Sequence, residues 1–150
     1  ELGLDFGIWV EPEMINEDSD LFRAHPNFAM RIPGREPTRM RNQLMLNLAD
    51  EKVQNYVVRV ITDVIARSGA AYVKWDYNRS FTDCYGKGVV QGEYFHRYML
   101  GYYRIVSRIT KKFLRCCSKA ARAAAEGWIW ATCATSSSSG RATTRTRASA

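Results

Sequence analysis

The stretch that most constrains the fold is Tyr72–Arg79, which reads YVKWDYNR. Its first residues favour a strand, and Lys74, Asp76 and Asn78 then bring polar side chains to every second position. The residues before it have a helical pattern that Gly69 interrupts. A helix, a short break and a strand that ends in polar residues are typical of a (β/α) barrel, in which catalytic groups lie at the carboxyl ends of the strands.

Lys74, Asp76 and Asn78 are expected to share one face of that strand, because side chains alternate along a strand. A lysine two residues before a carboxylate keeps the carboxylate ionised and can also hold a substrate hydroxyl. Taken alone, the pattern K-x-D-x-N is more often an ion pair at an exposed strand end than a catalytic site. The rest of the chain decides between these two interpretations.

Strands and helices alternate along residues 1–113, which predicts an α/β domain with parallel strands. Asp50 is a candidate cap for the helix that follows it, and Pro12 ends the first strand. The predicted strands are 4–10, 43–48 and 71–76, and the predicted helices are 51–68 and 93–113, with loops at 31–41 and 79–92 and a short helix within 16–30. The apolar side of the last helix is predicted to contain Tyr94, Tyr98, Leu100, Tyr102, Ile105, Val106 and Ile109.

The length of 150 residues allows one modest domain. A complete (β/α)8 TIM barrel takes about 250 residues, so the expected fold is an incomplete barrel with central strands and helices only. The chain opens at Glu1 directly in strand-like sequence, and we therefore expect a truncated start. It contains no signal peptide and no apolar run of membrane-spanning length, which favours a cytoplasmic protein without a membrane partner.

Residues 114–150 differ in composition from the rest of the chain. Residues 1–113 carry 16 Lys/Arg and 14 Asp/Glu, whereas residues 114–150 carry 6 and 1, so the formal charge of +7 belongs mostly to the tail. Ala, Ser and Thr make up 21 of the last 37 residues, without an apolar period that could pack a core. We therefore predict a partial barrel over 1–113 and a low-complexity basic tail over 114–150 that is disordered or non-native.

Five motifs in residues 1–113 together resemble the catalytic barrel of α-galactosidases of glycoside hydrolase family 36, the melibiases. They occur in the family's order and at similar spacing, and the combination of G-x-W-x-E-P-E-M with K-W-D-x-N is specific. The motifs are FGIWVEPEM (6–14), RAHP (23–26), RNQLMLNL (41–48), YVKWDYNR (72–79) and GEYFHRYMLGYY (92–103).

The resemblance implies hydrolysis of terminal α-linked galactose, as in raffinose and melibiose, by a retaining mechanism. Such a mechanism needs two carboxyl groups about 5–5.5 Å apart, one as nucleophile and one as acid/base. Asp76 matches the family's nucleophile, and Lys74 and Asn78 match the sugar-binding residues beside it. Trp9 matches the tryptophan that lines the galactose pocket, and Arg41 matches an arginine of the same pocket.

The resemblance also implies an α-galactoside oligosaccharide as partner, no nucleic acid, and assemblies of identical subunits among full-length members. No cofactor is implied, since two carboxyl groups suffice for the reaction. Glu11 and Glu13 lie two residues apart on one segment, and we interpret both as structural rather than as a catalytic pair. His25 and His96 lack neighbouring cysteines or carboxylates in the sequence, so no metal site is expected.

The chain departs from the family pattern at three places. The family's paired-aspartate motif belongs before residue 1, and Asn47 stands where the family usually has aspartate. The acid/base should lie in a C-S-x-G-G-G-R-x-D motif soon after residue 113, and this motif is absent as written.

A shifted reading frame accounts for the missing motif. We translated the tail in the frame that starts on the third base of each codon. In that frame the tryptophan codon TGG of Trp128 followed by the isoleucine codon ATN of Ile129 gives GAT, which encodes aspartate whatever the isoleucine codon. With permissible codons, residues 116–134 then read LLEGCSGGGGRMDLGYLR. We therefore predict a one-base deletion near Leu114, after which the residues are not native, and an isolated chain that is nearly inactive.

Two other functions remain open from the sequence alone. Within the same class, the chain could come from an α-N-acetylgalactosaminidase or a galactosyl-transferring relative. From a different class, it could be a non-enzymatic fragment, or a protein that binds nucleic acid through its basic tail.

Overall fold

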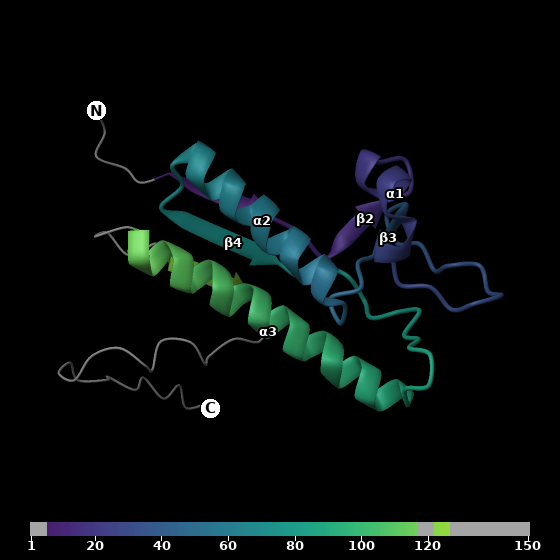
Figure 1. Ribbon diagram of the computed structural model, residues 1–150. Coiled ribbons are helices and arrows are strands. Elements are labelled where there is room, and N and C mark those ends of the chain that lie inside the picture. The colour runs from purple at the N-terminus through teal and green to yellow at the C-terminus, as the bar shows by residue number, and fades with distance from the viewer. Residues whose placement is uncertain (1–5, 117–121, 127–150) are drawn as a thin grey trace, which may run out of the picture.

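The computed structural model describes residues 6–116 and 122–126 of the chain. Figure 1 shows an α/β arrangement in which two long helices lie over a small parallel sheet. The elements in chain order are β1 (Gly7–Val10), β2 (Met14–Asn16), α1 (Asp20–Ala24), the 3-10 helix η1 (Pro26–Phe28), β3 (Gln43–Met45), α2 (Glu51–Ser68), β4 (Tyr72–Asp76), α3 (Gln91–Cys116) and β5 (Arg122–Glu126).

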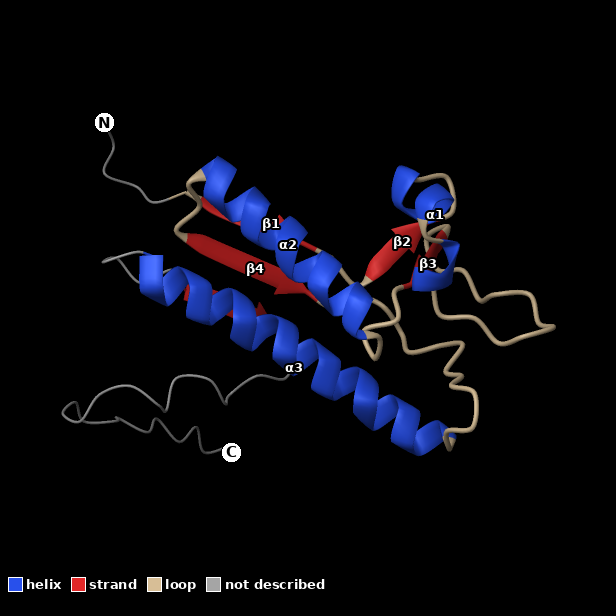
Figure 2. Cartoon of the chain, in the orientation of Figure 1, coloured by secondary structure: helices blue, strands red, loops and turns tan. Residues whose placement is uncertain are grey.

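The sheet has the strand order β1-β4-β5, and both neighbouring pairs are parallel. Trp9 of β1 is the register partner of Lys74 in β4, and Asp76 is the register partner of Glu126 in β5. Helices α2 and α3 lie on one face of this sheet (Figure 2). Val73 and Trp75 are buried among the core residues of these elements, so the alternate side chains of β4 point to the other face.

Helix α2 begins and ends where the sequence predicts. The Asp50 carboxylate accepts a hydrogen bond from the backbone N–H of Lys52 at 2.7 Å, and Gly69 ends the helix with a φ of 65°. The buried apolar residues of α2 recur at helical spacing, and burying each contributes about 1.5–3 kcal/mol to stability. They are Val53, Val57, Ile61 and Ile65.

Helix α3 confirms the predicted last helix, although it is longer at both ends than the predicted 93–113. Tyr98 and Ile105 are completely buried, and Tyr94, Tyr102 and Ile109 are nearly so. The prediction was wrong for Leu100, which is 38% exposed. Leu100 lies two residues after Tyr98, and two residues turn an α-helix by more than half a circle, so the two side chains point to opposite sides.

A second, two-stranded sheet lies beside the end of β4 (Figure 1). Its strands β2 and β3 are antiparallel, with Met14 opposite Met45 and Asn16 opposite Gln43. Sequence analysis did not predict β2, and it predicted a longer strand for 43–48 than the three residues of β3. Ser19 caps α1 by accepting a hydrogen bond from the backbone N–H of Phe22 at 3.1 Å.

The ends of the predictions fall partly outside the described residues. The first predicted strand, 4–10, is β1 from Gly7 onward, and residues 4 and 5 are not described. Sequence analysis predicted no strand in the tail, but the structure has β5 there, paired with β4. Strands pair through backbone hydrogen bonds, which the composition of a segment does not reveal. The remaining tail from 117 lies outside the described residues. Across the described helices, no stretch is both long and apolar enough to cross a membrane.

Candidate functional site

The carboxyl ends of β1 and β4 bring Trp9 and Asp76 together. The indole Nε1–H of Trp9 donates a hydrogen bond to Oδ2 of Asp76 at 3.1 Å, across 67 positions of sequence. The Trp9 side chain is 50% exposed, so its ring is available to a ligand. Lys74 is the register partner of Trp9 and shares the face of β4 that carries Asp76. These three residues therefore line the helix-free face of the sheet.

Asp76 is held as a carboxylate by its surroundings. The hydrogen bond from Trp9 lowers its pKa most, the Asn78 side chain lowers it further, and the positive charges of Lys74 and Arg41 add to the effect. A carboxyl group whose pKa lies below its ordinary range is ionised at neutral pH. It can therefore act as a nucleophile or stabilise a developing positive charge, but not as a proton donor.

Glu11 joins the two other predicted sugar-binding residues. Its Oε1 accepts a hydrogen bond from Nδ2 of Asn78 at 2.6 Å and lies 3.3 Å from an Nη of Arg41. The structure thus brings all five predicted site residues, Trp9, Arg41, Lys74, Asp76 and Asn78, to the carboxyl ends of two neighbouring strands. Sequence analysis left Glu11 out of the site.

Arg41 reaches the site from a turn with unusual backbone geometry. Arg41 and Asn42 have φ values of 53° and 59°, in the left-handed region that residues other than glycine seldom adopt. Such conformations cost roughly 1–3 kcal/mol each and persist only where the surrounding structure holds them. The strained pair directly precedes β3, whose pairing with β2 fixes the end of the turn.

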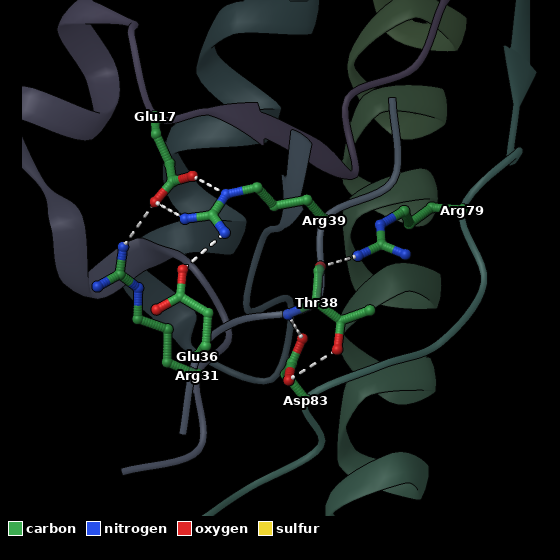
Figure 3. A network of polar contacts seen from close by, with 7 residues as sticks. All are labelled: Glu17, Arg31, Glu36, Thr38, Arg39, Arg79 and Asp83. Carbon is green, nitrogen blue, oxygen red and sulfur yellow. Dashed lines mark hydrogen bonds and ion pairs between the residues drawn. The ribbon is translucent and has the colours of Figure 1, made fainter. Parts of the chain in front are cut away.

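The loop that carries Arg41 is attached to the segment after β4, as Figure 3 shows. Asp83 accepts hydrogen bonds from the backbone N–H of Thr38 at 2.9 Å and from its hydroxyl at 3.4 Å. The guanidinium of Arg79, a buried residue, donates to the carbonyl oxygen of Thr38 at 2.7 Å. We call Arg79, Asp83 and Thr38 the loop clasp. Because Arg79 follows Asn78 directly, the clasp links the Arg41 loop to the strand that carries Asp76.

An ion-pair network stabilises the outer part of the same loop (Figure 3). Glu17 binds Arg39 through both carboxylate oxygens, at 2.5 and 3.2 Å, and lies 3.4 Å from Arg31. Arg39 also binds Glu36 at 2.7 Å. Arg39 lowers the pKa of Glu17, mainly through its hydrogen bond. Each of these side chains remains in partial contact with solvent, so each pair contributes little to stability by itself.

Glu13 is buried next to the site without facing it. Its side chain is fully inaccessible to solvent, and burial raises its pKa. Oε2 accepts a hydrogen bond from the indole N–H of Trp75 at 2.9 Å, and Oε1 accepts one from the backbone N–H of Asn78 at 3.2 Å. Nothing in the sequence separates Glu13 from Glu11, because burial depends on the three-dimensional packing around each side chain.

Asn47 lies in a core contact at the start of α2. Its Oδ1 accepts hydrogen bonds from the Tyr94 hydroxyl at 2.7 Å and from the backbone N–H of Ala49 at 3.2 Å.

No group of histidine, cysteine and carboxylate side chains that could hold a metal ion is present within 6–116 and the other described part of the chain.

Comparison with known proteins matches the chain to one family over most of its length. The family model described as Melibiase matches residues 1–128. The chain is 44% identical over 116 residues to alpha-galactosidase AgaA of Geobacillus stearothermophilus, and 46% identical over 113 residues to the bifunctional alpha-galactosidase/sucrose kinase AgaSK of Mediterraneibacter gnavus. Each match covers 75% of this chain but only 16% and 12% of the two relatives.

The fold is similar to solved structures of the same enzymes. The crystal structure of AgaA, a family 36 alpha-galactosidase, matches with a TM-score of 0.70 and 43% identity, over 75% of this chain and 16% of that chain. A variant of AgaA solved in complex with raffinose matches with a TM-score of 0.69 over the same shares. The chain therefore spans about one sixth of the length of these relatives.

Proposed function

Because the chain belongs to the melibiase family, we propose that it is part of the catalytic domain of an α-galactosidase. The proposed substrates are oligosaccharides with a terminal α-linked galactose, and relatives solved with raffinose and with stachyose support this class. The observation that carries the proposal is the ionised carboxylate of Asp76 beside the half-exposed ring of Trp9. A charged nucleophile next to an aromatic face suits a sugar ring, which has both an apolar face and an electrophilic anomeric carbon.

Asp76 is the proposed nucleophile of a retaining mechanism. Its carboxylate forms a bond to the anomeric carbon while the glycosidic C–O bond breaks, and an acid carboxyl gives its proton to the departing oxygen. Water then attacks the glycosyl-enzyme, the same acid residue takes the proton of that water, and the bond to Asp76 breaks. The hydrogen bond from Trp9 and the charges of Lys74 and Arg41 support the role, because they keep Asp76 ionised.

The remaining site residues are proposed to bind the galactose. The Trp9 ring contacts the apolar face of the sugar, and Lys74, Asn78 and Arg41 donate hydrogen bonds to its hydroxyls. Their positions at the carboxyl ends of β1 and β4 support this role, since ligands of parallel α/β folds bind at that edge. Glu11 orients Asn78 and Arg41 from behind the sugar-facing groups.

The described strands are proposed to form one side of a (β/α)8 barrel. Three neighbouring parallel strands with helices on one face are the repeating arrangement of that fold, whose other face points into the barrel. The polar face of β4 would then point inward and upward to the pocket. The other strands would come from the rest of a longer protein.

Residues from about 114 onward are proposed to be read in a shifted frame. The family model matches as far as residue 128, whereas the composition changes abruptly at about 114. Strand pairing uses the backbone, so a segment read in the restored frame can occupy the place of β5 beside β4. The aspartate that the restored frame encodes at Trp128–Ile129 is the proposed acid/base.

The function is tested on the full-length protein in its restored frame with an aryl α-galactoside as substrate. We expect turnover that Asp76→Ala reduces at least about a thousandfold, because a nucleophile cannot be replaced by binding alone. Asp63→Ala is the matched control, since Asp63 is exposed on α2 and pairs only weakly with Arg67 at 3.5 Å. A fluorinated galactosyl fluoride should label Asp76.

Two outcomes would contradict the proposal. A label on any other residue would remove Asp76 from its role. Rapid turnover by the purified 150-residue chain as written, lost in Asp76→Ala, would show that no further carboxyl group is needed.

A further inference from the structure

We propose that Glu13 is a positioning residue that fixes the geometry of the Asp76 nucleophile by holding both ends of the segment around it. The inference rests on the proposed function of Asp76. It assigns a role to a residue that does not face the sugar and that the sequence marks only as one of two similar glutamates.

The hydrogen bonds of Glu13 enclose Asp76 along the chain. One oxygen binds the side chain of Trp75, the residue before Asp76, and the other binds the backbone N–H of Asn78, two residues after it. A single carboxylate therefore ties down a four-residue segment at both ends. Asp76 lies within this segment, and its own carboxylate is directed by the hydrogen bond from Trp9.

Aromatic packing holds the same segment from the side of α3. The Trp75 ring meets the Tyr102 ring edge-to-face with centroids 4.9 Å apart, and Tyr77 meets Tyr102 at 6.1 Å. The hydroxyl oxygens of Tyr77 and Tyr98 are 3.3 Å apart. These contacts limit movement away from the helices. The pairing of β4 with β1 and β5 holds Trp75 and Asp76 within the sheet, and Glu13 extends this support past the end of the strand to Asn78.

The backbone of Glu13 is itself anchored. Its carbonyl oxygen accepts a hydrogen bond from the N–H of Leu46 at 2.9 Å, next to the pairing of Met14 with Met45. Glu13 thus connects the β2–β3 sheet, whose strand β3 directly follows the Arg41 turn, with the end of β4.

The burial of Glu13 argues against a merely incidental contact. A carboxylate without solvent exposure is unfavourable unless hydrogen bonds compensate for its lost hydration, and the raised pKa of Glu13 reflects this cost. Glu11 differs, because its side chain is 15% exposed and binds the side chains of Asn78 and Arg41. Glu11 acts on sugar-binding groups, whereas Glu13 acts on the backbone that carries the nucleophile.

The test uses Glu13→Gln in the full-length protein, because glutamine keeps the volume but presents an NH2 group to one of the two donors. We expect kcat for an aryl α-galactoside to fall about 10- to 100-fold, since small misplacements of reacting groups have effects of this size. KM should change less than kcat, because Trp9, Lys74 and Arg41 make no hydrogen bond to Glu13 and Asn78 contacts it only through its backbone. The rate at which a fluorinated galactosyl fluoride labels Asp76 should fall with kcat.

Trp75→Phe provides the second variant, since it removes one donor and leaves the carboxylate in place. It should also lower kcat, and Glu13→Gln should cost less in the Trp75→Phe background than in the wild type, because the two residues share one hydrogen bond. Glu93→Gln is the matched control and should leave kcat unchanged, because Glu93 is exposed on α3 and pairs with Arg97 of the same helix. If Glu13→Gln loses its cooperative thermal transition, Trp75→Phe decides the question.

The outcomes separate this inference from the proposed function. Wild-type protein without turnover or label, or an active Asp76→Ala variant, would overturn the proposed function and this inference with it. An active wild type, an inactive Asp76→Ala, and folded Glu13→Gln and Trp75→Phe variants with wild-type kcat and labelling rate would overturn the role of Glu13 alone.

Discussion

At the scale of single residues, sequence reasoning reaches side chains that belong to a pattern and misses those that depend on packing. Lys74, Asp76 and Asn78 are spaced by two along a predicted strand, so their shared face follows from the alternation of side chains. Trp9 needed the family resemblance, because a tryptophan in a strand is ordinarily a core residue, and here it is half exposed. Glu13 shows the limit, since its burial and its two donors come from elements that are distant in the sequence.

The pKa of Asp76 is predicted to rise toward its ordinary value of 3.8 in the variant Trp9→Phe, because that variant removes the hydrogen bond with the largest lowering effect. A carboxyl group whose pKa is lowered by folding stabilises the folded state at pH values above its unfolded-state pKa. This stabilisation is lost as the pH falls through the lowered pKa of the folded state. Trp9→Phe should therefore lose less stability on acidification than the wild type. Carboxyl-carbon NMR titration measures the pKa directly, and urea unfolding at several pH values measures the stability.

Glu17 is the internal reference for this titration, because its pKa is lowered by Arg39, which Trp9→Phe leaves in place. An Asp76 titration that is identical in the variant and the wild type would show that the indole hydrogen bond does not set the charge state of the nucleophile.

At the scale of elements, local signals predict the helices better than the short strands. Helix α2 has a cap at Asp50, a stop at Gly69 and a long apolar period, all of which are local. Strand β2 has only three residues and exists because β3 pairs with it, so its sequence carries too few alternations to be recognised. Helix α3 begins at Gln91, earlier than predicted. Its first turn follows a glycine-rich loop and contains Gly92, so the local sequence indicates a loop there.

The approach of α3 to the start of α2 depends on Gly101. A Cβ atom there would lie 1.8 Å from the carbonyl oxygen of Leu48 and 2.9 Å from Nε2 of Gln54, which itself binds that carbonyl. We predict that Gly101→Ala lowers the free energy of unfolding by about 1–3 kcal/mol, although alanine favours the helix by about 1 kcal/mol. Urea unfolding followed by circular dichroism measures the change.

Gly92→Ala is the matched control for Gly101→Ala, because Gly92 also lies in α3 and a Cβ there would meet no atom within 4 Å. It should be neutral or stabilising by up to about 1 kcal/mol. Equal effects of the two substitutions would show that helix propensity, and not the contact with Leu48, determines the stability change.

At the scale of the whole molecule, the described part of the chain is an α/β arrangement built on a parallel sheet. Helices cover one face of the β1-β4-β5 sheet, whereas parallel sheets are ordinarily covered on both faces or closed into a barrel. The alternation of strands and helices in the sequence predicted the parallel pairing of the strands. The tail was harder to interpret, because a composition without an apolar period does not indicate where backbone pairing occurs.

The nucleotide sequence around codon 114 tests the proposed origin of the tail. We expect that adding one base there opens a frame encoding the glycine-rich segment followed by aspartate, and that the net charge of the encoded tail becomes less positive. The codons for α2 serve as the control, since the same shift should produce no sequence similar to the family in that region. An uninterrupted gene whose codons cannot encode that segment would refute the frameshift.

The loop clasp has a consequence for engineering the pocket. Arg79 and Asp83 hold the loop at Thr38, three residues before Arg41, while the preceding tip around Gly34 is exposed to solvent. Segments of other lengths could be grafted between Ile32 and Thr38 without altering residues 38–41, which place Arg41 at the site. A library of such loop exchanges would change the residues of the loop tip. It would leave Asp76 and the strand β4 that carries it unchanged.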